Sequence, residues 1–365
     1  MISSFYRNKK ILITGANGFK GIWLSLWLKL LGANVYGIGL SEHDTFFSKN
    51  INIRNVIKFK NLDITNFKNI SNFLKKINPE IIFHLAGQPL VFNAYKNPIK
   101  TFETNSNGTL NILEASNNNK YVKSLLCITS DKSYKNINTN TPYKETDILM
   151  GDDPYSASKS SADIIINSYQ KTLKRKDLGI AVARAGNVIG GGDFSENRII
   201  PDIVESIRKN KSINLRNPYA TRPWQHVLDP LNGYLILAKK TFQNSKAFSD
   251  AFNFGPERKE KMSVIKVCKK FLKYAKSDIK ILIKKNKSIK EHGKLLLSIE
   301  KSKKILKWKP LYSVENSILK TSEWYVDIFK NQKNPFQITV KQLMEYSVKT
   351  SFKIKYDSAK KIKNN

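Results

Sequence analysis

Residues 10–21 read KILITGANGFKG, and this stretch decides the fold of the chain. The apolar run 10–14 is typical of a buried parallel strand, and the apolar residues of 19–31 recur at helical spacing. Glycines between a strand and a helix let the backbone approach a pyrophosphate beside the helix N-terminus. The stretch therefore predicts a dinucleotide site, with an ordinary tight turn as the alternative. The candidate cofactor contacts here are Gly15, Asn17, Gly18, Phe19, Lys20 and Gly21.

Strand-like and helix-like segments alternate along the rest of the N-terminal half. Strands are expected at 34–38, 56–61, 80–85, 124–129 and 180–184, with a helix at 101–116. This alternation predicts an α/β fold with a doubly wound parallel sheet. We expect a dinucleotide-binding domain over residues 1–185 and a smaller, mainly substrate-binding part over 186–350, from which the chain crosses back once. A basic, solvated tail is expected over 351–365.

Composition excludes several classes of protein. The chain has 365 residues, of which 41% are apolar, and its apolar runs are too short to span a bilayer. No charged-then-apolar leader follows Met1, and Cys127 and Cys268 are too few for a disulfide framework or a zinc site. A reduced, cytoplasmic protein without a metal is expected. The net charge of +34 is spread along the chain as lysine, which argues against nucleic acid but favours a dianionic substrate.

A second motif places a phenol and an ammonium close together. Tyr155 and Lys159 are one helical turn apart on one face. A phenol, with a pKa of about 10, is a poor base at neutral pH, and a nearby ammonium lowers that pKa. A surface Tyr–Lys pair is the alternative for the motif alone. Ser130, Asp131 and Lys132 follow the strand expected at 124–129. Together these groups suggest hydride chemistry with a second proton transfer.

These motifs resemble the extended short-chain dehydrogenase/reductase family. The spacing G-x-x-G-x-x-G is typical of that family, and an acid directly after Ser130 is typical of its sugar-nucleotide 4,6-dehydratases. Those dehydratases usually carry Thr-Asp-Glu, whereas the Asp-Lys pair here resembles the CDP-glucose branch. The stretches that extend this resemblance are 18–28, 84–91, 153–159, 183–193 and 220–227. The resemblance implies a Rossmann-type sheet, bound NAD and a nucleotide-diphosphate sugar as substrate, in a homodimer or homotetramer.

The resemblance also implies further cofactor contacts. Leu85 and Ala86 match the loop that lines the nicotinamide ribose, and Tyr155 and Lys159 also contact the cofactor. Asp63 matches an acid that contacts adenine, although a helix cap explains it equally well. No acid closes the strand at 34–38 before Glu42, and no arginine stands there for a 2′-phosphate. The choice between NAD and NADP therefore stays open at this point.

The substrate side is expected in the second part of the chain. Arginine binds phosphate in a bidentate manner, so its arginines are candidates for the diphosphate, with surface ion pairs as the alternative. Trp224 is as easily explained by packing as by binding. The candidate substrate contacts are Gln88, Asn187, Arg198, Arg216, Arg222, Trp224 and Asn253.

The implied reaction is an intramolecular oxidoreduction that ends as a dehydration. Tyr155, helped by Lys159 and Ser130, would remove the C4 hydroxyl proton, and Asp131 would protonate the leaving C6 hydroxyl. The base at C5 is left open between Lys132 and another group, because lysine must be neutral to act as a base. The alternatives are a 4-epimerase, a dehydratase for another sugar nucleotide, and a binding protein without catalysis.

Overall fold

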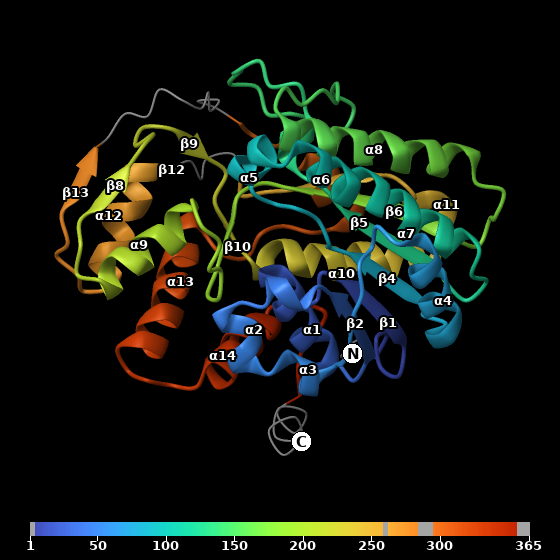
Figure 1. Cartoon of the computed structure of the whole chain (residues 1–365), viewed down its shortest axis with the longest axis horizontal. Helices are drawn as coiled ribbons and strands as arrows, with labels where there is room; N and C mark the ends of the chain where they lie inside the picture. Colours follow the sequence, from blue (N-terminus) through green and yellow to red (C-terminus); the bar gives the residue numbers. More distant parts are fainter. Residues whose placement is uncertain (1–3, 258–261, 284–294, 356–365) are drawn as a thin grey trace.

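A seven-stranded parallel sheet forms the centre of the computed structural model, which describes residues 4–257, 262–283 and 295–355 (Figure 1). The strand order is β11-β6-β5-β4-β1-β2-β3, and every neighbouring pair is parallel. The strands are β1 (Lys10–Thr14), β2 (Asn34–Gly39), β3 (Lys58–Asn61), β4 (Ile81–His84), β5 (Ser124–Ile128), β6 (Gly179–Ala185) and β11 (Ala251–Phe254). The predicted α/β class with a doubly wound parallel sheet is confirmed.

Helices cover both faces of this sheet. One face carries α1 (Phe19–Leu30), α10 (Leu228–Gln243) and α14 (Pro335–Ser347). The other carries α4 (Phe67–Ile77), α7 (Gly108–Asn117) and α8 (Pro154–Thr172). Successive strand residues alternate between the two layers, so that Ile11 and Ile13 join one buried cluster and Leu12 joins the other. This alternation explains why the strands are apolar along their whole length.

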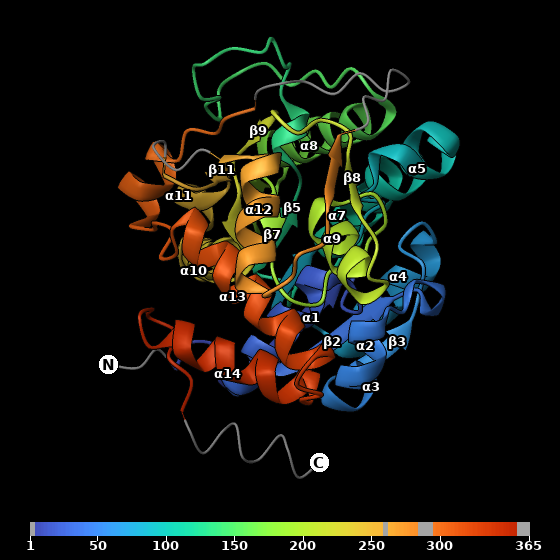
Figure 2. The same cartoon turned by 90° about the vertical axis from the view of Figure 1, so that its left-hand side faces the viewer.

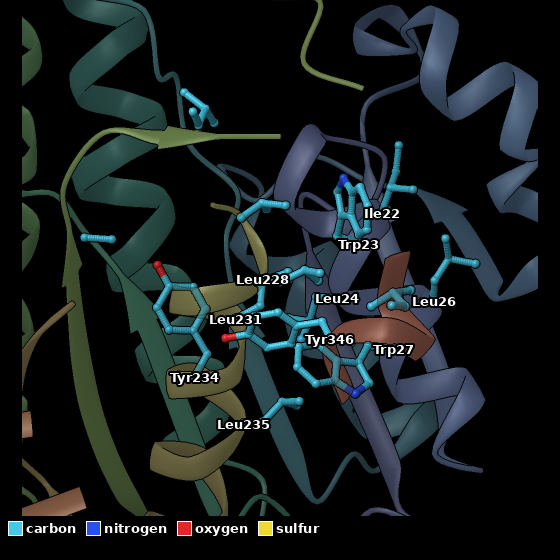
Figure 3. Packing of buried hydrophobic residues seen from close by; sticks show 14 of the residues in the cluster. Ile22, Trp23, Leu24, Leu26, Trp27, Leu228, Leu231, Tyr234, Leu235 and Tyr346 are labelled. Carbon is cyan, nitrogen blue, oxygen red and sulfur yellow. The ribbon is translucent and has the colours of Figure 1, made fainter. Parts of the chain in front are cut away.

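The helix α1 lies in the middle of the larger cluster. Its side chains Trp23 and Trp27 are fully buried. The ring of Trp27 packs against that of Tyr346 of α14 at 5.8 Å between centroids (Figure 3), whereas the ring of Trp23 lies near those of Phe47 and His226. The helix ends where Gly32 adopts a positive φ of 84°, a conformation that glycine adopts without strain. The glycine turn is thereby anchored at the end of a rigid, fully packed helix.

A smaller part lies beside the sheet and is built mainly from residues after 186 (Figures 1 and 2). It contains α9 (Ile199–Arg208), β8 (Ile213–Leu215), β9 (Thr221–Arg222), β12 (Met262–Ser263), α12 (Val264–Tyr274), β13 (Ile281–Ile283) and α13 (Val314–Phe329). Between these stretches the chain returns to the main sheet as α10 and β11. The domain division at residue 185 stays a prediction.

Short elements complete the connections. They are the turn η1 (Ser41–His43), α2 (Phe46–Ile51), α3 (Ile53–Val56), α5 (Val91–Lys96), α6 (Pro98–Phe102), the π-helical turn η2 (Glu103–Asn107), η3 (Asp131–Ser133), β7 (Val188–Ile189), β10 (Gln225–His226), α11 (Ser245–Phe248) and η4 (Ser302–Leu306). The strand expected at 56–61 begins only at Lys58, because Val56 ends α3. Among the described residues, no helix combines the length and apolarity needed to cross a membrane.

At the beginning of the expected basic tail Phe352 is docked and not solvated, whereas Ser351, Lys353 and Lys355 are exposed as expected. Phe352 is 1% exposed and packs against the ring of Tyr6 at 5.4 Å between centroids. Its carbonyl oxygen accepts a hydrogen bond from the indole N–H of Trp27 at 3.2 Å. Burying the Phe352 ring removes a large apolar area from water, and this favourable free energy keeps the residue docked although lysines flank it. Residues 356–365 of the expected tail lie outside the described residues.

Candidate active site

The glycine turn after β1 has the geometry that a pyrophosphate needs. Gly15 has a φ of 68°, and a Cβ built there would lie 2.9 Å from the backbone of Ala86. Gly18 is the N-cap of α1 and provides no side-chain cap. A Cβ on Gly21 would collide with the carbonyl oxygen of Gly15. The first N–H groups of α1 lack intrahelical partners, so they are available to an anion. The turn therefore fits a dinucleotide.

The loop after β4 is fixed against this turn. The N–H of Ala86 donates to the Thr14 hydroxyl at 3.0 Å, and that hydroxyl contacts Nδ1 of His84 at 2.8 Å. Burial, together with the charge of Lys159, lowers the pKa of His84 to about 3. His84 is therefore neutral and structural. Leu85 and Ala86 are half-buried beside the turn, as a cofactor-lining loop requires.

The polar residues after β5 form a compact, buried group. The hydroxyl of Ser130 donates to Oδ1 of Asp131 at 3.1 Å and accepts from the N–H of Lys132 at 3.2 Å. Burial raises the pKa of Asp131, although the nearby cations Lys132, Arg222 and Lys20 oppose that rise. Its Oδ2 is buried without a hydrogen-bond partner in the described part of the chain. A carboxyl of this kind is suited to donate a proton to a ligand.

Tyr155 and Lys159 project from the first turns of α8 toward this group. Asp153 caps the helix by accepting from the N–H groups of Tyr155 (2.9 Å) and Ser156 (3.1 Å). Burial raises the pKa of Tyr155, while hydrogen bonding with Ser130 and the charge of Arg198 lower it. Nζ of Lys132 lies 5.9 Å from the centre of the Tyr155 ring. The structure thus brings the predicted proton-transfer residues together.

Lys159 is 8% exposed, and burial lowers its pKa to about 8, against the effect of Asp163. The side chain is still mostly protonated at neutral pH, and its charge lowers the pKa values of His84 and Lys20. Arg198 is the cation whose charge lowers the pKa of Tyr155 most, and the expected effect of Lys159 on that pKa stays a prediction. Lys159 remains well placed beside the loop at Gly87, where a Cβ would lie 3.0 Å from its Nζ.

Lys20 reaches from the glycine turn into the proton-transfer group. Burial lowers its pKa to about 8, and the charges of Arg198 and Lys159 lower it further, while Asp131 raises it. The sequence placed this side chain only at the cofactor. The structure adds a second amine to the surroundings of Asp131.

Asn105 is a site residue that the sequence did not indicate. It lies in η2, is 1% exposed, and accepts from the N–H of Gln88 at 2.7 Å. Its Nδ2 donates to the carbonyl oxygen of Gln88 at 3.1 Å and to the hydroxyl of Ser158 at 2.9 Å. A single asparagine therefore ties the loop after β4 to α8. A lone polar residue inside a helical pattern carries no signal of this function.

The amide of Gln88 is committed within its own loop. Its Oε1 accepts from the N–H of Leu90 at 2.6 Å, and its Nε2 donates to the carbonyl oxygen of Leu90 and to Thr101, both at 3.0 Å. The side chain was expected to contact substrate. Its observed contacts shape the loop, and its expected contact with substrate stays a prediction.

The three candidate arginines occupy different positions. Arg198 donates to Asp193 at 3.2 Å and to the carbonyl oxygen of Pro89 at 3.3 Å. Its charge lowers the pKa values of Tyr155 and Lys20. The charge of Arg222 lowers the pKa of Asp131. Arg216 lies against the ring of Phe92 at 4.6 Å. Arg198 and Arg222 are therefore the two that surround the proton-transfer group.

Two predicted substrate residues are structural. Trp224 is 3% exposed, and its indole N–H donates to the carbonyl oxygen of Met262 at 2.9 Å. The side chain of Asn253 is fully buried, where it accepts from the hydroxyl of Tyr134 at 2.7 Å and donates to the carbonyl oxygens of Tyr143 and Ser298. These are packing contacts, and the predicted contacts of both residues with substrate stay predictions.

Two further candidates have mainly local contacts. The carboxylate of Asp63 accepts from the N–H of Thr65 at 2.9 Å, while Asn66 caps α4, so Asp63 forms a turn and not a helix cap. Asn187 is half-buried, and its carbonyl oxygen accepts from the N–H of Gln225 at 3.0 Å. The predicted adenine and sugar contacts of these residues stay predictions.

Comparison with known proteins places this geometry in a family. The family model described as GDP-mannose 4,6 dehydratase matches residues 12–321. A CDP-glucose 4,6-dehydratase from Salmonella typhimurium is 35% identical, over 88% of this chain and 92% of that protein. A dTDP-D-glucose 4,6-dehydratase from Dictyostelium discoideum is 30% identical, over 64% of this chain and 56% of that protein.

A solved structure shows the same fold. A dTDP-glucose 4,6-dehydratase from Bacillus anthracis in complex with NAD has a TM-score of 0.74 at 22% identity, covering 88% of this chain and 98% of that one. The family match extends from β1 to α13 and so includes the glycine turn, the residues after β5 and α8. The chain belongs to the GDP-mannose 4,6-dehydratase family of extended short-chain dehydrogenase/reductases.

Proposed function

We propose that the chain is an NAD-dependent 4,6-dehydratase that converts CDP-glucose to CDP-4-keto-6-deoxyglucose. The observation that carries this proposal is the buried carboxyl of Asp131, with its raised pKa and an oxygen atom without a partner in the described chain, beside Ser130 and Tyr155. The relative from Salmonella typhimurium supports CDP-glucose as the substrate.

The chain's own residues carry out the proton transfers at C4 and C6. Bound NAD on the glycine turn supplies the acceptor and donor of hydride. Tyr155 takes the proton of the C4 hydroxyl, and Ser130 holds that hydroxyl. Asp131 protonates the departing C6 hydroxyl, which its raised pKa favours. Arg198 and Arg222 bind the diphosphate beside this group.

The base that removes the C5 proton is one of two amines. Lys132 lies beside the Tyr155 ring, and Lys20 approaches Asp131 from the opposite element, α1. The lowered pKa of Lys20, about 8, gives it a neutral fraction near physiological pH, as a general base requires.

A product assay tests the proposal. The full chain is incubated with NAD and, separately, with CDP-, dTDP-, UDP- and GDP-glucose, and each product is identified by mass spectrometry and NMR. A keto sugar that has lost one water from CDP-glucose supports the proposal. A C4 epimer would establish the 4-epimerase instead, and unchanged sugar with measurable binding would indicate a protein without catalysis.

Three wider expectations belong to the same proposal. Cys127 and Cys268 are buried free thiols, which supports a reducing cytoplasm. Apolar side chains are exposed on α6 and α8, with Ile99 75% and Ile164 55% exposed, which supports a homodimer or homotetramer. Light scattering of the purified protein measures that state. The division at residue 185 into dinucleotide-binding and mainly substrate-binding parts completes the proposal.

A further inference from the structure

A buried ion pair lies next to the proton-transfer group, between α8 and the sheet. Asp163 follows Lys159 by four residues, so the two side chains share one face of α8, one turn apart. Arg184 comes from β6, against which α8 packs. Its Nε and Nη2 donate to Oδ1 of Asp163 at 3.1 and 3.0 Å, and both side chains are buried. The protein therefore encloses a carboxylate and a guanidinium within one helical turn of Lys159.

Arg184 also bonds to the residue that ends the turn with Asp131. Its Nη1 donates to the hydroxyl of Tyr134 at 2.8 Å, and Tyr134 directly follows η3. The guanidinium carbon lies 4.9 Å from the centre of the Tyr134 ring. One guanidinium therefore fixes α8, with its Tyr155 and Lys159, against the turn that carries Asp131.

The carboxylate of Asp163 has an oxygen that Arg184 does not use. This atom, Oδ2, is buried without a hydrogen-bond partner in the described part of the chain. A buried carboxylate is costly unless a charge or a hydrogen bond compensates it. Burial lowers the pKa of Lys159 to about 8, and the charge of Asp163 is the largest effect that opposes this fall. Asp163 thus interacts with two cations, Arg184 and Lys159.

Three other titratable groups interact with the charge of Lys159 among the described residues, and none of them is an anion at neutral pH. On β4, burial lowers the pKa of His84 to about 3, so the ring is neutral. On β5, burial raises the pKa of the Cys127 thiol far above the neutral range. On α1, Lys20 is a second cation, which repels Lys159. None of these groups can balance the charge of Lys159.

The elements that pack against α8 carry their charges elsewhere. The charged residues on α5, α6, η2 and α7 are exposed or half-buried, and they are Lys96, Lys100, Glu103 and Glu114. On η3, Nζ of Lys132 lies 5.9 Å from the centre of the Tyr155 ring, and Asp131 accepts from Ser130. Asp163 is therefore the anion that acts on the Lys159 ammonium.

We propose that Asp163 is a positioning residue, which keeps the Lys159 ammonium charged and in place beside Tyr155. Arg184 holds Asp163 for this purpose and ties it to the turn at Asp131. A buried ion pair adds little net stability, because desolvation offsets the attraction between its charges. The inference rests on the part of the proposed function in which Lys159 assists Tyr155, and not on the identity of the sugar or of the base at C5.

Replacing Asp163 by asparagine in the full-length protein tests the inference. Asparagine keeps the shape of the side chain and an acceptor for Arg184 but removes the charge. NMR of protein that contains isotope-labelled lysine follows the titration of the Lys159 Cε resonance, which is assigned by its loss in Lys159→Arg. Asp163→Asn should lower the pKa of Lys159 by about one unit, because a compensating charge is gone. The matched control is Asp177→Asn, which removes a paired carboxylate just before β6, at the edge of the sheet away from the glycine turn, and should change nothing.

The pH profile of the first hydride transfer is the second measurement. Reduction of bound NAD by CDP-glucose in a single turnover is followed by absorbance. A protonated Lys159 that assists Tyr155 loses its proton as the pH rises, so a lower pKa moves the alkaline limb of the profile to lower pH. In Asp163→Asn the rate at pH 9 should therefore fall about tenfold, while the dissociation constant of CDP-glucose stays within about twofold of the wild-type value.

A second substitution separates charge from shape. Asp163→Glu restores the charge but fits the buried site less well, so it should return the Lys159 titration toward that of the wild type. If Asp163→Asn does not fold, the double variant Asp163→Asn with Arg184→Met provides the same test without an unpaired guanidinium.

Three outcomes decide the matter. A folded Asp163→Asn protein in which Lys159 titrates as in the wild type would overturn the inference. Equal losses of rate in Asp163→Asn and Asp163→Glu, without a shift of the alkaline limb, would overturn it by showing a purely structural role. A shifted Lys159 titration without a keto sugar from any sugar nucleotide would refute the proposed reaction and leave the inference standing.

Discussion

Replacing Asp229 by asparagine should stabilise the protein at neutral and alkaline pH. Asp229 is fully buried in α10, where its Oδ1 accepts from the hydroxyl of Tyr346 at 2.7 Å and from the N–H of Leu311 at 2.7 Å. Its Oδ2 has no partner within the described residues. Burial raises its pKa to about 7, although these hydrogen bonds lower it. The unfolded chain returns this carboxyl to an ordinary pKa near 3.9.

The sign and size of the effect follow from this difference. The folded state holds the proton more tightly, so the contribution of Asp229 to stability falls as pH rises from about 4 to about 7. Three pKa units correspond to about 4 kcal/mol, all of which is lost above pH 7. Asparagine keeps the acceptor oxygen but adds an unpaired buried amide, at a cost of about 1–3 kcal/mol. The net gain above pH 7 is therefore about 1–3 kcal/mol.

Denaturant unfolding from pH 5 to 8.5 measures this difference directly. The free energy of unfolding of Asp229→Asn should exceed that of the wild type above pH 7, and the two curves should cross as the pH falls. Asp278→Asn, which removes an exposed carboxylate, should follow the wild-type curve at every pH. Parallel curves for Asp229→Asn and the wild type would show that Asp229 has an ordinary pKa in the folded protein.

Four substitutions test the proposed chemistry. Tyr155→Phe should abolish turnover while sugar-nucleotide binding by calorimetry stays nearly intact; activity within tenfold of wild type would remove the phenol from the reaction. Asp131→Asn should slow water elimination by roughly 10²- to 10⁴-fold and leave C4 oxidation in place, seen as absorbance of reduced cofactor; an equal loss in both steps would make Asp131 structural. Lys132→Met and Lys20→Met should differ in C5-proton exchange with deuterated solvent, and the one that loses exchange identifies the base. If both exchange normally, neither lysine is the base.

The sequence predicted those parts of the molecule in which local pattern and geometry coincide. A glycine turn between a strand and a helix commonly binds a dinucleotide, and a Tyr and a Lys four residues apart on a helix lie on the same face. For Trp224 and Asn253 the sequence could not separate packing from binding, because an indole or an amide serves both. The ion pair between Arg54 and Asp44 could not be predicted, because the short helices α2 and α3 decide whether these side chains meet. The burial of Phe352 could not be predicted either, because its partner Tyr6 lies at the other end of the chain.

The burial of α1 has a consequence for synthesis of the protein. Most of its residues are buried, and the indole of Trp27 packs against Tyr346 of α14 (Figure 3). The ribosome makes α1 first and Tyr346 more than 300 residues later, an interval of roughly 15 to 60 s at ordinary elongation rates. During that interval one of the most apolar helices of the chain lacks its covering layer. Expression at low temperature or with trigger-factor-type holdases should therefore raise the yield of folded protein.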